Sequence, residues 1–237
     1  MRGSVALLRR GILLFLFSLY LTTVLGLSSG QAADLRDLEG ILGRTGALQE
    51  GALVFRFPRS DIQVTIDGWL MPTALGFAGW TAWKEMGSEA MVMGDLVLLE
   101  KEINPVISAL AGANLQVTAL LNHFLGERPR IMYLHIYGMG DAVTMARGLQ
   151  SALDRTATPK PRVSSTPSSQ AKSNLDTRRL EQIIGHAGTA GGGAFKVTVG
   201  RSGVKMEGVE LTASLGLNSW AAFVGTNDRA HVQVILP

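Results

Sequence analysis

Cysteine is absent from all 237 residues of the sequence. The chain therefore forms no disulfide and carries no thiol for lipid attachment, so packing or bound ligands must stabilise its fold. Aromatic residues are scarce as well, at 6%. Hydrophobic residues make up 46% and charged residues 17%, which is typical of a globular protein and excludes a wholly disordered or collagen-like chain.

An excess of positive charge is also missing once the N-terminus is set aside. The formal net charge is +3, but Arg2, Arg9 and Arg10 account for it, because residues 1–32 contain no Asp or Glu. The remainder is balanced and has no basic stripe of the kind that binds a phosphate backbone. We therefore expect no nucleic-acid partner.

The N-terminus has the pattern of a secretory signal. Arg9 and Arg10 precede the apolar run from Gly11 to Leu27, and Gly30-Gln31-Ala32 provides a small-x-small cleavage site. We predict that residues 1–32 are a signal peptide and that the protein is exported to the periplasm or secreted. The alternative is an uncleaved anchor, which would be the only membrane contact, because the apolar run is at the lower limit for spanning a bilayer.

An internal repeat indicates the domain organisation. The segment from Leu38 to Gly46 is similar to that from Leu180 to Gly188. Further matches follow in the same order: Gly51-Ala52 with Gly193-Ala194, Arg59-Ser60 with Arg201-Ser202, Leu75-Gly76 with Leu215-Gly216, and Trp80 with Trp220. We predict a tandem duplication, with a complete first copy at 33–155 and an incomplete second copy at 179–237 that packs on the first.

The segment between the copies has the composition of a linker. Residues 156–178 contain Pro159, Pro161 and Pro167 among Ser, Thr, Lys and Gln. So few apolar side chains cannot offset the entropy of ordering, and we predict a disordered linker.

Apolar periodicity within the first copy predicts an α+β fold. The expected helices are Leu35 to Leu42, Glu100 to Ala111, and a segment capped by Asp141 that runs to Leu153. The expected strands are Ala52 to Phe57, Ile62 to Ile66, Trp80 to Met86, Met91 to Leu99, Leu115 to Leu121 and Arg130 to Tyr137. This order predicts a mainly antiparallel sheet with helices on one face.

The densest polar cluster lies in and after the segment Asn122 to Arg130. It contains His123 and Glu127, and His135 follows on the next expected strand. Imidazoles with a carboxylate suit zinc or a similar divalent ion and also serve as an acid/base set. The spacing matches no strong metal motif, so ordinary hydrogen-bonding roles in a turn and a sheet are the alternative.

Two functions follow from this cluster. In a metal-dependent hydrolase, His123 and His135 would bind the metal and Glu127 would activate the metal-bound water. In a non-catalytic extracytoplasmic module, which would bind a small ligand or a protein partner without turning it over, the binding contacts would be Asn122, Arg130, Tyr137 and His231. The sequence has neither a Gly-x-Ser-x-Gly elbow nor a cysteine nucleophile, which favours the binding module but leaves enzymatic activity open.

Four motifs carry a family resemblance: Phe57 to Asp61, Glu89 to Asp95, Glu102 to Val106, and Asn122 to Arg130. In these the chain resembles the LppY/LpqO family, a group of exported bacterial proteins of uncharacterised function. The resemblance covers essentially the whole mature chain. It implies a two-copy α+β architecture and supplies no established reaction.

The sequence departs from the family pattern in three ways. It lacks the cysteine that named members use for lipidation, and its second copy ends early. Leu121 stands where the family commonly has the first histidine of a His-Asn-His motif, which weakens a metal site. A degenerate, truncated family member is therefore a third interpretation.

Overall fold

The computed structural model describes residues 35–160 and 173–236. The predicted signal peptide and the central part of the predicted linker lie outside these ranges. Within them, no helix is both long enough and apolar enough to cross a membrane.

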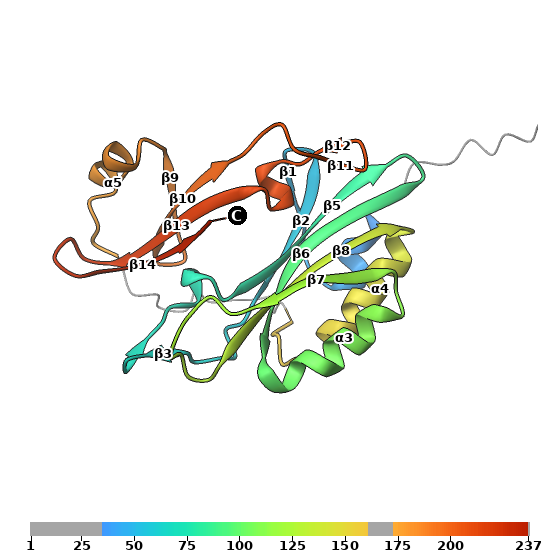
Figure 1. Cartoon of the computed structure of the whole chain (residues 1–237), viewed down its shortest axis with the longest axis horizontal. Coiled ribbons are helices and arrows are strands. Elements are labelled where there is room, and N and C mark those ends of the chain that lie inside the picture. The colour runs from blue at the N-terminus through green and yellow to red at the C-terminus, as the bar shows by residue number, and fades with distance from the viewer. Residues whose placement is uncertain (1–34, 161–172, 237) are drawn as a thin grey trace, which may run out of the picture. The chain divides into compact units, whose positions relative to one another are not determined.

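A six-stranded sheet is the centre of the first segment, in the order β1-β2-β5-β6-β8-β7 (Figure 1). All neighbouring strands are antiparallel. The strands are β1 (Ala47–Gln49), β2 (Ala52–Pro58), β5 (Ala78–Met86), β6 (Glu89–Leu99), β7 (Leu115–Leu121) and β8 (Ile131–Gly140). With the helices described next, the sheet confirms the predicted α+β class.

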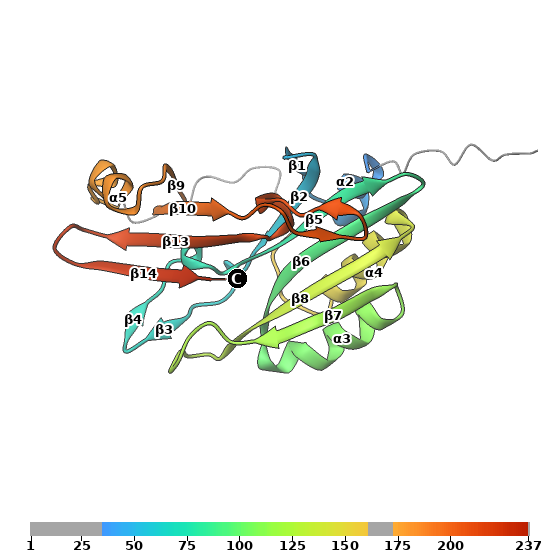
Figure 2. The same ribbon diagram turned by 45° about the horizontal axis from the view of Figure 1, so that its top comes forward.

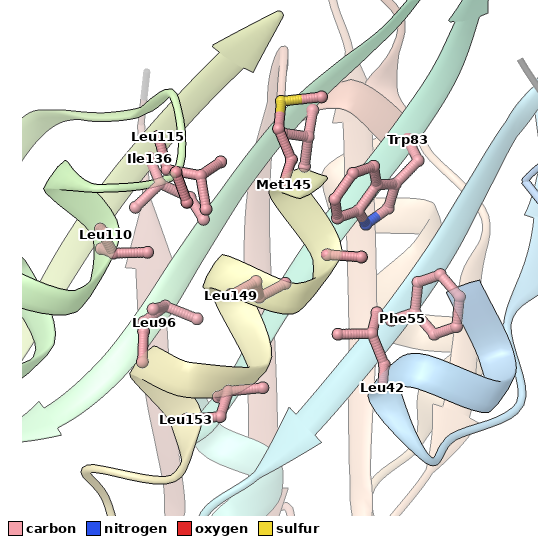
Figure 3. Close-up of a cluster of buried hydrophobic side chains, with 14 of the residues drawn as sticks. Leu42, Phe55, Trp83, Leu96, Leu110, Leu115, Ile136, Met145, Leu149 and Leu153 are labelled. Carbon is pink, nitrogen blue, oxygen red and sulfur yellow. The ribbon is translucent and has the colours of Figure 1, made fainter. Parts of the chain in front are cut away.

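Three helices cover one face of this sheet (Figure 1). They are α2 (Asp37–Leu42), α3 (Ile103–Ala111), which follows the 3-10 turn η2 (Glu100–Glu102), and α4 (Ala142–Leu153). The predicted cap of α4 is confirmed, because the Asp141 carboxylate accepts a hydrogen bond from the backbone N–H of Thr144 at 2.8 Å. Leu110, Leu149 and Trp83 are fully buried between helices and sheet (Figure 3).

The second segment contains a four-stranded antiparallel sheet in the order β14-β13-β10-β9. Its elements are α5 (Thr177–Ile184), β9 (Gly188–Gly191), β10 (Ala194–Gly200), β11 (Lys205–Met206), β12 (Val209–Glu210), η3 (Ala213–Leu215), β13 (Asn218–Gly225) and β14 (Ala230–Ile235). The first segment has the same order of elements from α2 to β6. This order agrees with the predicted repeat, while common ancestry of the two segments remains a prediction.

The predicted strand from Ile62 to Ile66 was wrong in extent. Only Thr65–Ile66 forms a strand, β3, and it pairs with β4 (Trp69–Leu70) in a separate hairpin (Figure 2). The connecting residues Asp67 and Gly68 both have positive φ, at 49° and 77°. An Asp-Gly pair in this conformation favours a two-residue hairpin, which removes the segment from the main sheet.

The ends of the predicted linker are attached to the fold. Asn174 forms a bridge with Thr226, and the backbone N–H of Asp176 donates to Oδ1 of Asn227 at 2.7 Å. The Asp176 carboxylate also caps α5 by accepting from the backbone N–H of Arg179 at 3.0 Å. The predicted disordered linker is therefore too long at its C-terminal end.

The two segments exchange buried leucines across their junction. Leu75, in η1 (Thr73–Leu75), is 1% exposed and belongs to a core cluster that includes Ala222 of the second segment. Leu215, at the matching position of η3, is also 1% exposed and joins a cluster with Ala82 of the first segment. The second segment thus covers the face of the six-stranded sheet that the helices leave uncovered.

Truncating one exchanged leucine tests this junction. We expect Leu215→Ala to lower the free energy of unfolding by about 2–5 kcal/mol, because the substitution leaves a cavity in a packed core. Leu48→Ala is the control, because Leu48 is 79% exposed. Urea unfolding of the purified protein measures both variants, and equal stabilities would contradict the packing role of Leu215.

A buried ion network fixes the end of β2. Arg59 is 1% exposed, and its guanidinium donates to Glu102 at 2.8 Å, to Asp61 at 2.9 Å and to the carbonyl oxygen of Val97 at 2.7 Å. Burial alone would lower the pKa of Arg59, but its hydrogen bonds and ion pairs with Asp61 and Glu102 raise it. Glu102 also accepts from the backbone N–H of Ala157 at 3.3 Å. The network therefore joins β2, β6, η2 and the residues after α4.

The second segment provides a matched control for this network. Arg59→Ala should cost about 3–5 kcal/mol of stability, because it leaves the buried carboxylate of Glu102 without a cation. Arg201 occupies the corresponding turn of the second segment but is exposed. Arg201→Ala should change stability by no more than about 0.5 kcal/mol. Thermal and urea unfolding compare the two variants, and a similar loss in both would contradict a special role for Arg59.

Candidate ligand site at the junction

An Asn–Glu pair shapes the loop between β7 and β8. The side-chain amide of Asn122 donates to Oε1 of Glu127 and, at 3.2 Å, to the carbonyl oxygen of Ile131. Oε1 of Glu127 also accepts from the backbone N–H of Ile131 at 3.3 Å. Glu127 is 5% exposed, so this pair carries a carboxylate into the interior at the beginning of β8.

His123 joins this loop to the second segment. Its ring stacks on Tyr133 of β8, with 3.4 Å between ring centroids. Its Nδ1 lies 3.3 Å from Nε2 of Gln233 on β14. Burial, with a smaller effect of His135, lowers the pKa of His123 to about 4. The ring is therefore neutral at neutral pH, and Nδ1 accepts a hydrogen bond from the Gln233 amide.

Asp95 and His135 lie opposite each other on β6 and β8. Nε2 of His135 is 3.8 Å from Oδ2 of Asp95, which is too long for a hydrogen bond. Burial raises the pKa of Asp95 to about 7 and lowers the pKa of His135. The side chain of His135 is 43% exposed and that of Asp95 is 15% exposed. Asp95 therefore changes its charge near neutral pH, close to a solvent-facing imidazole.

Four buried side-chain atoms of the described residues have no hydrogen-bond partner. They are Oδ1 of Asp95, Oε2 of Glu127, the hydroxyl of Tyr133 and Oε1 of Gln233. Burial raises the pKa of Tyr133, and the nearby charges of Asp95 and Glu127 raise it further while Gln233 opposes them, so Tyr133 lies among the other three. We call these four residues the junction cluster.

The unpartnered buried atoms of the junction cluster lower the stability of the fold unless something binds to them. An unsatisfied buried polar group costs about 1–3 kcal/mol, and such groups in native proteins are usually explained by water, an ion or a ligand. Three of the four residues, Glu127, Tyr133 and Gln233, are at least nine-tenths buried. The cluster therefore has the chemistry of a binding site that includes residues from both segments.

Gly76 allows the close approach of the two segments at this site. A Cβ atom at Gly76 would lie 2.5 Å from Oε1 of Gln233, and the glycine has φ of 107°. Any other residue would be strained in its backbone and would displace the Gln233 amide. A side chain at this position would therefore alter the junction cluster directly.

The predicted site residues divide into those near the cluster and those away from it. The structure brings Asn122, His123 and Glu127 beside Tyr133, and it places His135 beside Asp95. The other three predicted ligand contacts lie elsewhere: Tyr137 packs in the hydrophobic cluster around Leu215, Arg130 is exposed, and His231 stacks on Trp69 with 3.5 Å between ring centroids.

The predicted zinc site receives no support from this arrangement. In the described ranges, no group of three or more His, Cys, Asp or Glu side chains is placed to hold a metal ion. His123 uses Nδ1 to contact Gln233, and Glu127 uses Oε1 to hold the loop. His123, His135 and Glu127 therefore do not form the expected set of two ligands and a free base.

The sequence analysis missed three residues of the cluster. Asp95 is a carboxylate inside the otherwise apolar run from Ala90 to Leu99, and that contrast could have singled it out. Tyr133 and Gln233 carry no such signal, because an aromatic residue in a strand and an alternating polar residue are ordinary features. Only tertiary packing brings them together.

The fold and the cluster define an α+β protein with a candidate binding site between two segments. The chain belongs to the family described as Domain of Unknown Function (DUF1259), whose model matches residues 36–155 and 178–234. No curated protein and no solved structure matches the chain.

Removing the charge of Asp95 tests the electrostatics of the site. A carboxyl group whose pKa is raised in the folded state binds more protons when folded, so its contribution to stability falls as pH rises from about 4 to 7. We expect Asp95→Asn to abolish this contribution, so the stability of the variant relative to the original protein should increase between pH 5 and pH 8. Chemical unfolding across this pH range measures the difference.

Comparing Asp95→Asn with the original protein separates the pH dependence of stability due to Asp95 from that due to His123. The lowered pKa of His123 makes stability rise with pH between about 4 and 6.5, which is the opposite direction. That contribution is present in both proteins and cancels in their difference. A difference that does not change with pH would contradict the buried, unpaired state of Asp95.

Proposed function

We propose that this protein is an exported, non-catalytic binding module that holds a small polar ligand at the junction cluster. One observation carries the proposal: all four unpartnered buried side-chain atoms of the described residues belong to residues grouped around Tyr133. A ligand that hydrogen-bonds to these atoms offsets the cost of burying them.

The position of the cluster favours binding as the role of the two-segment arrangement. Asp95, Glu127 and Tyr133 belong to the first segment, and Gln233 belongs to the second. Ligand sites commonly lie where two packed units meet. A ligand that contacts both segments would also stabilise their junction in proportion to its concentration and affinity.

Export and wider family membership are supported by the sequence. The arginines before an apolar run and the small residues ending at Ala32 favour a cleaved signal peptide. The shared motifs favour membership of the LppY/LpqO family, and we include it in the proposal. A periplasmic or secreted address is compatible with the absence of cysteine.

A binding role fits the site better than hydrolysis. The hydrolase hypothesis needs a metal-bound water with Glu127 as its base. His123 is instead stacked and hydrogen-bonded, and His135 lies beside Asp95 rather than Glu127. The unpartnered atoms are suited to holding a ligand, and no group of three or more His, Cys, Asp or Glu side chains in the described residues is placed to hold the metal that the hydrolase needs.

Native mass spectrometry of protein purified from the bacterial envelope tests this proposal. We expect the mass of a chain that begins at Ala33, together with the added mass of a non-covalently bound small molecule, the adduct. Tyr133→Phe removes one cluster hydroxyl and should reduce the fraction of protein with the adduct about tenfold, since a hydrogen bond lost in a buried site costs about 1–3 kcal/mol.

Tyr137→Phe is the matched control. It removes a hydroxyl from the same strand face, but Tyr137 packs outside the cluster. The adduct should persist in this variant. If the adduct persists to the same extent in Tyr133→Phe, the ligand binds outside the cluster. If the purified protein carries no bound molecule other than water, the binding proposal is contradicted.

A further inference from the structure

We infer that the outward face of the four-stranded sheet in the second segment is the interface of a homodimer. Ala222 and Val224 of β13 pack in the core shared with the first segment, so the alternate side chains of the sheet point away from that core. They include Phe223, its partner Val232 on β14, and Val234. We call this side of the sheet the outward face.

The outward face exposes large apolar side chains. Val232 and Val234 are each 53% exposed, and Leu236, which continues the same alternation, is 75% exposed. Gln233, between the two valines, is buried on the other side of the sheet beside His123. Apolar side chains gathered on one surface in this way mark an interaction site.

The first segment shows how such a face is covered. In the predicted repeat alignment, Val232 and Leu236 correspond to Val92 and Leu96, which are buried under the helices. The described part of the second segment has no counterpart of α3 and α4 (Figure 1). Positions that form a core in the first segment are therefore open to an intermolecular contact in the second.

The helix α5 shows the same contrast. It matches α2, whose Leu38 and Leu42 are buried in the core that includes α4. No residue of α5 is buried, and Ile183 is 67% exposed. The backbone N–H of Asp176 donates to Asn227 in the β13-β14 hairpin and so holds the start of α5 at the end of the sheet. The apolar side of α5 is thus fixed in place without a partner helix.

The charges at this end of the sheet favour a second copy of the chain as the partner. The start of α5 and the β13-β14 hairpin carry exposed groups of both signs: Asp176, Asp228, Arg178, Arg179 and Arg229. An anionic membrane or a nucleic acid requires a basic surface. In a two-fold interface the same mixed set comes from both copies, so acidic groups of one copy face basic groups of the other.

The size of the outward face fits a weak dimer. The three longer strands, β10, β13 and β14, have 7, 8 and 6 residues. At about 4.8 Å between strands and about 3.3 Å per residue, the sheet with β9 covers roughly 400 Å². With α5, two copies would bury about 1,000 Å², which is near the lower limit for a specific interface. A dissociation constant in the micromolar range follows.

Sedimentation equilibrium of the protein purified from the bacterial envelope tests the dimer. We expect a change from monomer to dimer mass across the micromolar range. Val232→Lys and Leu236→Lys should each weaken the dimer about tenfold or more, because a two-fold interface receives each introduced ammonium group twice. Leu48→Lys is the control, since it changes an exposed leucine on β1 of the first segment and should leave the dimer intact. Thermal unfolding verifies that the variants are folded.

The absence of cysteine allows a second test. A single introduced thiol can be cross-linked only to a second copy, so Val234→Cys should give a covalent dimer with a bifunctional maleimide. Leu48→Cys should remain a monomer under the same conditions.

Three results would overturn the dimer. They are a monomer throughout the concentration range, association that both lysine variants leave unchanged, and equal cross-linking of Val234→Cys and Leu48→Cys. A monomer that binds phosphatidylglycerol vesicles, and loses this binding in Val232→Lys, would also overturn it and assign the outward face to a membrane. None of these results depends on the adduct at the junction cluster.

Discussion

A central strand that is apolar on both faces imposes the main constraint on this fold. In β6, Leu96 is buried against the helices, and its neighbour Val97 is buried on the opposite face. Other elements must cover both faces of a strand with this pattern. The helices supply one cover, and the second segment supplies the other through Leu215 and its neighbours. The reciprocal packing of the two segments therefore follows from the hydrophobicity of the sheet that lies between them.

The junction cluster interrupts this otherwise apolar cover. Asp95 lies on the same face of β6 as Val97, where a hydrophobic side chain would pack without any polar cost. Tyr133 and Gln233 extend the polar region across the junction, and each keeps one unpartnered atom. Sequences that break a packing rule without local compensation usually do so at functional sites. The unpartnered atoms of the cluster lower stability, and the proposed ligand would offset that cost.

Most of the fold could be predicted from the sequence, and the site could be predicted only in part. Apolar periodicity indicated the helices and the long strands, and the cap at Asp141 was confirmed. The Asp67-Gly68 hairpin was missed although its turn signal is present, because the preceding apolar run looked like a continuous strand. The loop from Asn122 to Arg130 was found because its polar residues are adjacent in sequence. Gln233 could not be found, since its partner His123 is more than a hundred residues away.

The two ends of the junction differ in a way that explains why only one of them is polar. In the predicted repeat alignment, Gln233 corresponds to Met93, and Gly76 corresponds to Gly216. Met93 packs in the apolar cluster of Leu215, so that end of the junction contributes packing. The opposite end places Gln233 against Gly76 and beside the loop that carries His123, an element for which the described second segment has no counterpart. The two matching contacts therefore differ, and the polar cluster lies where the additional loop contacts the second segment.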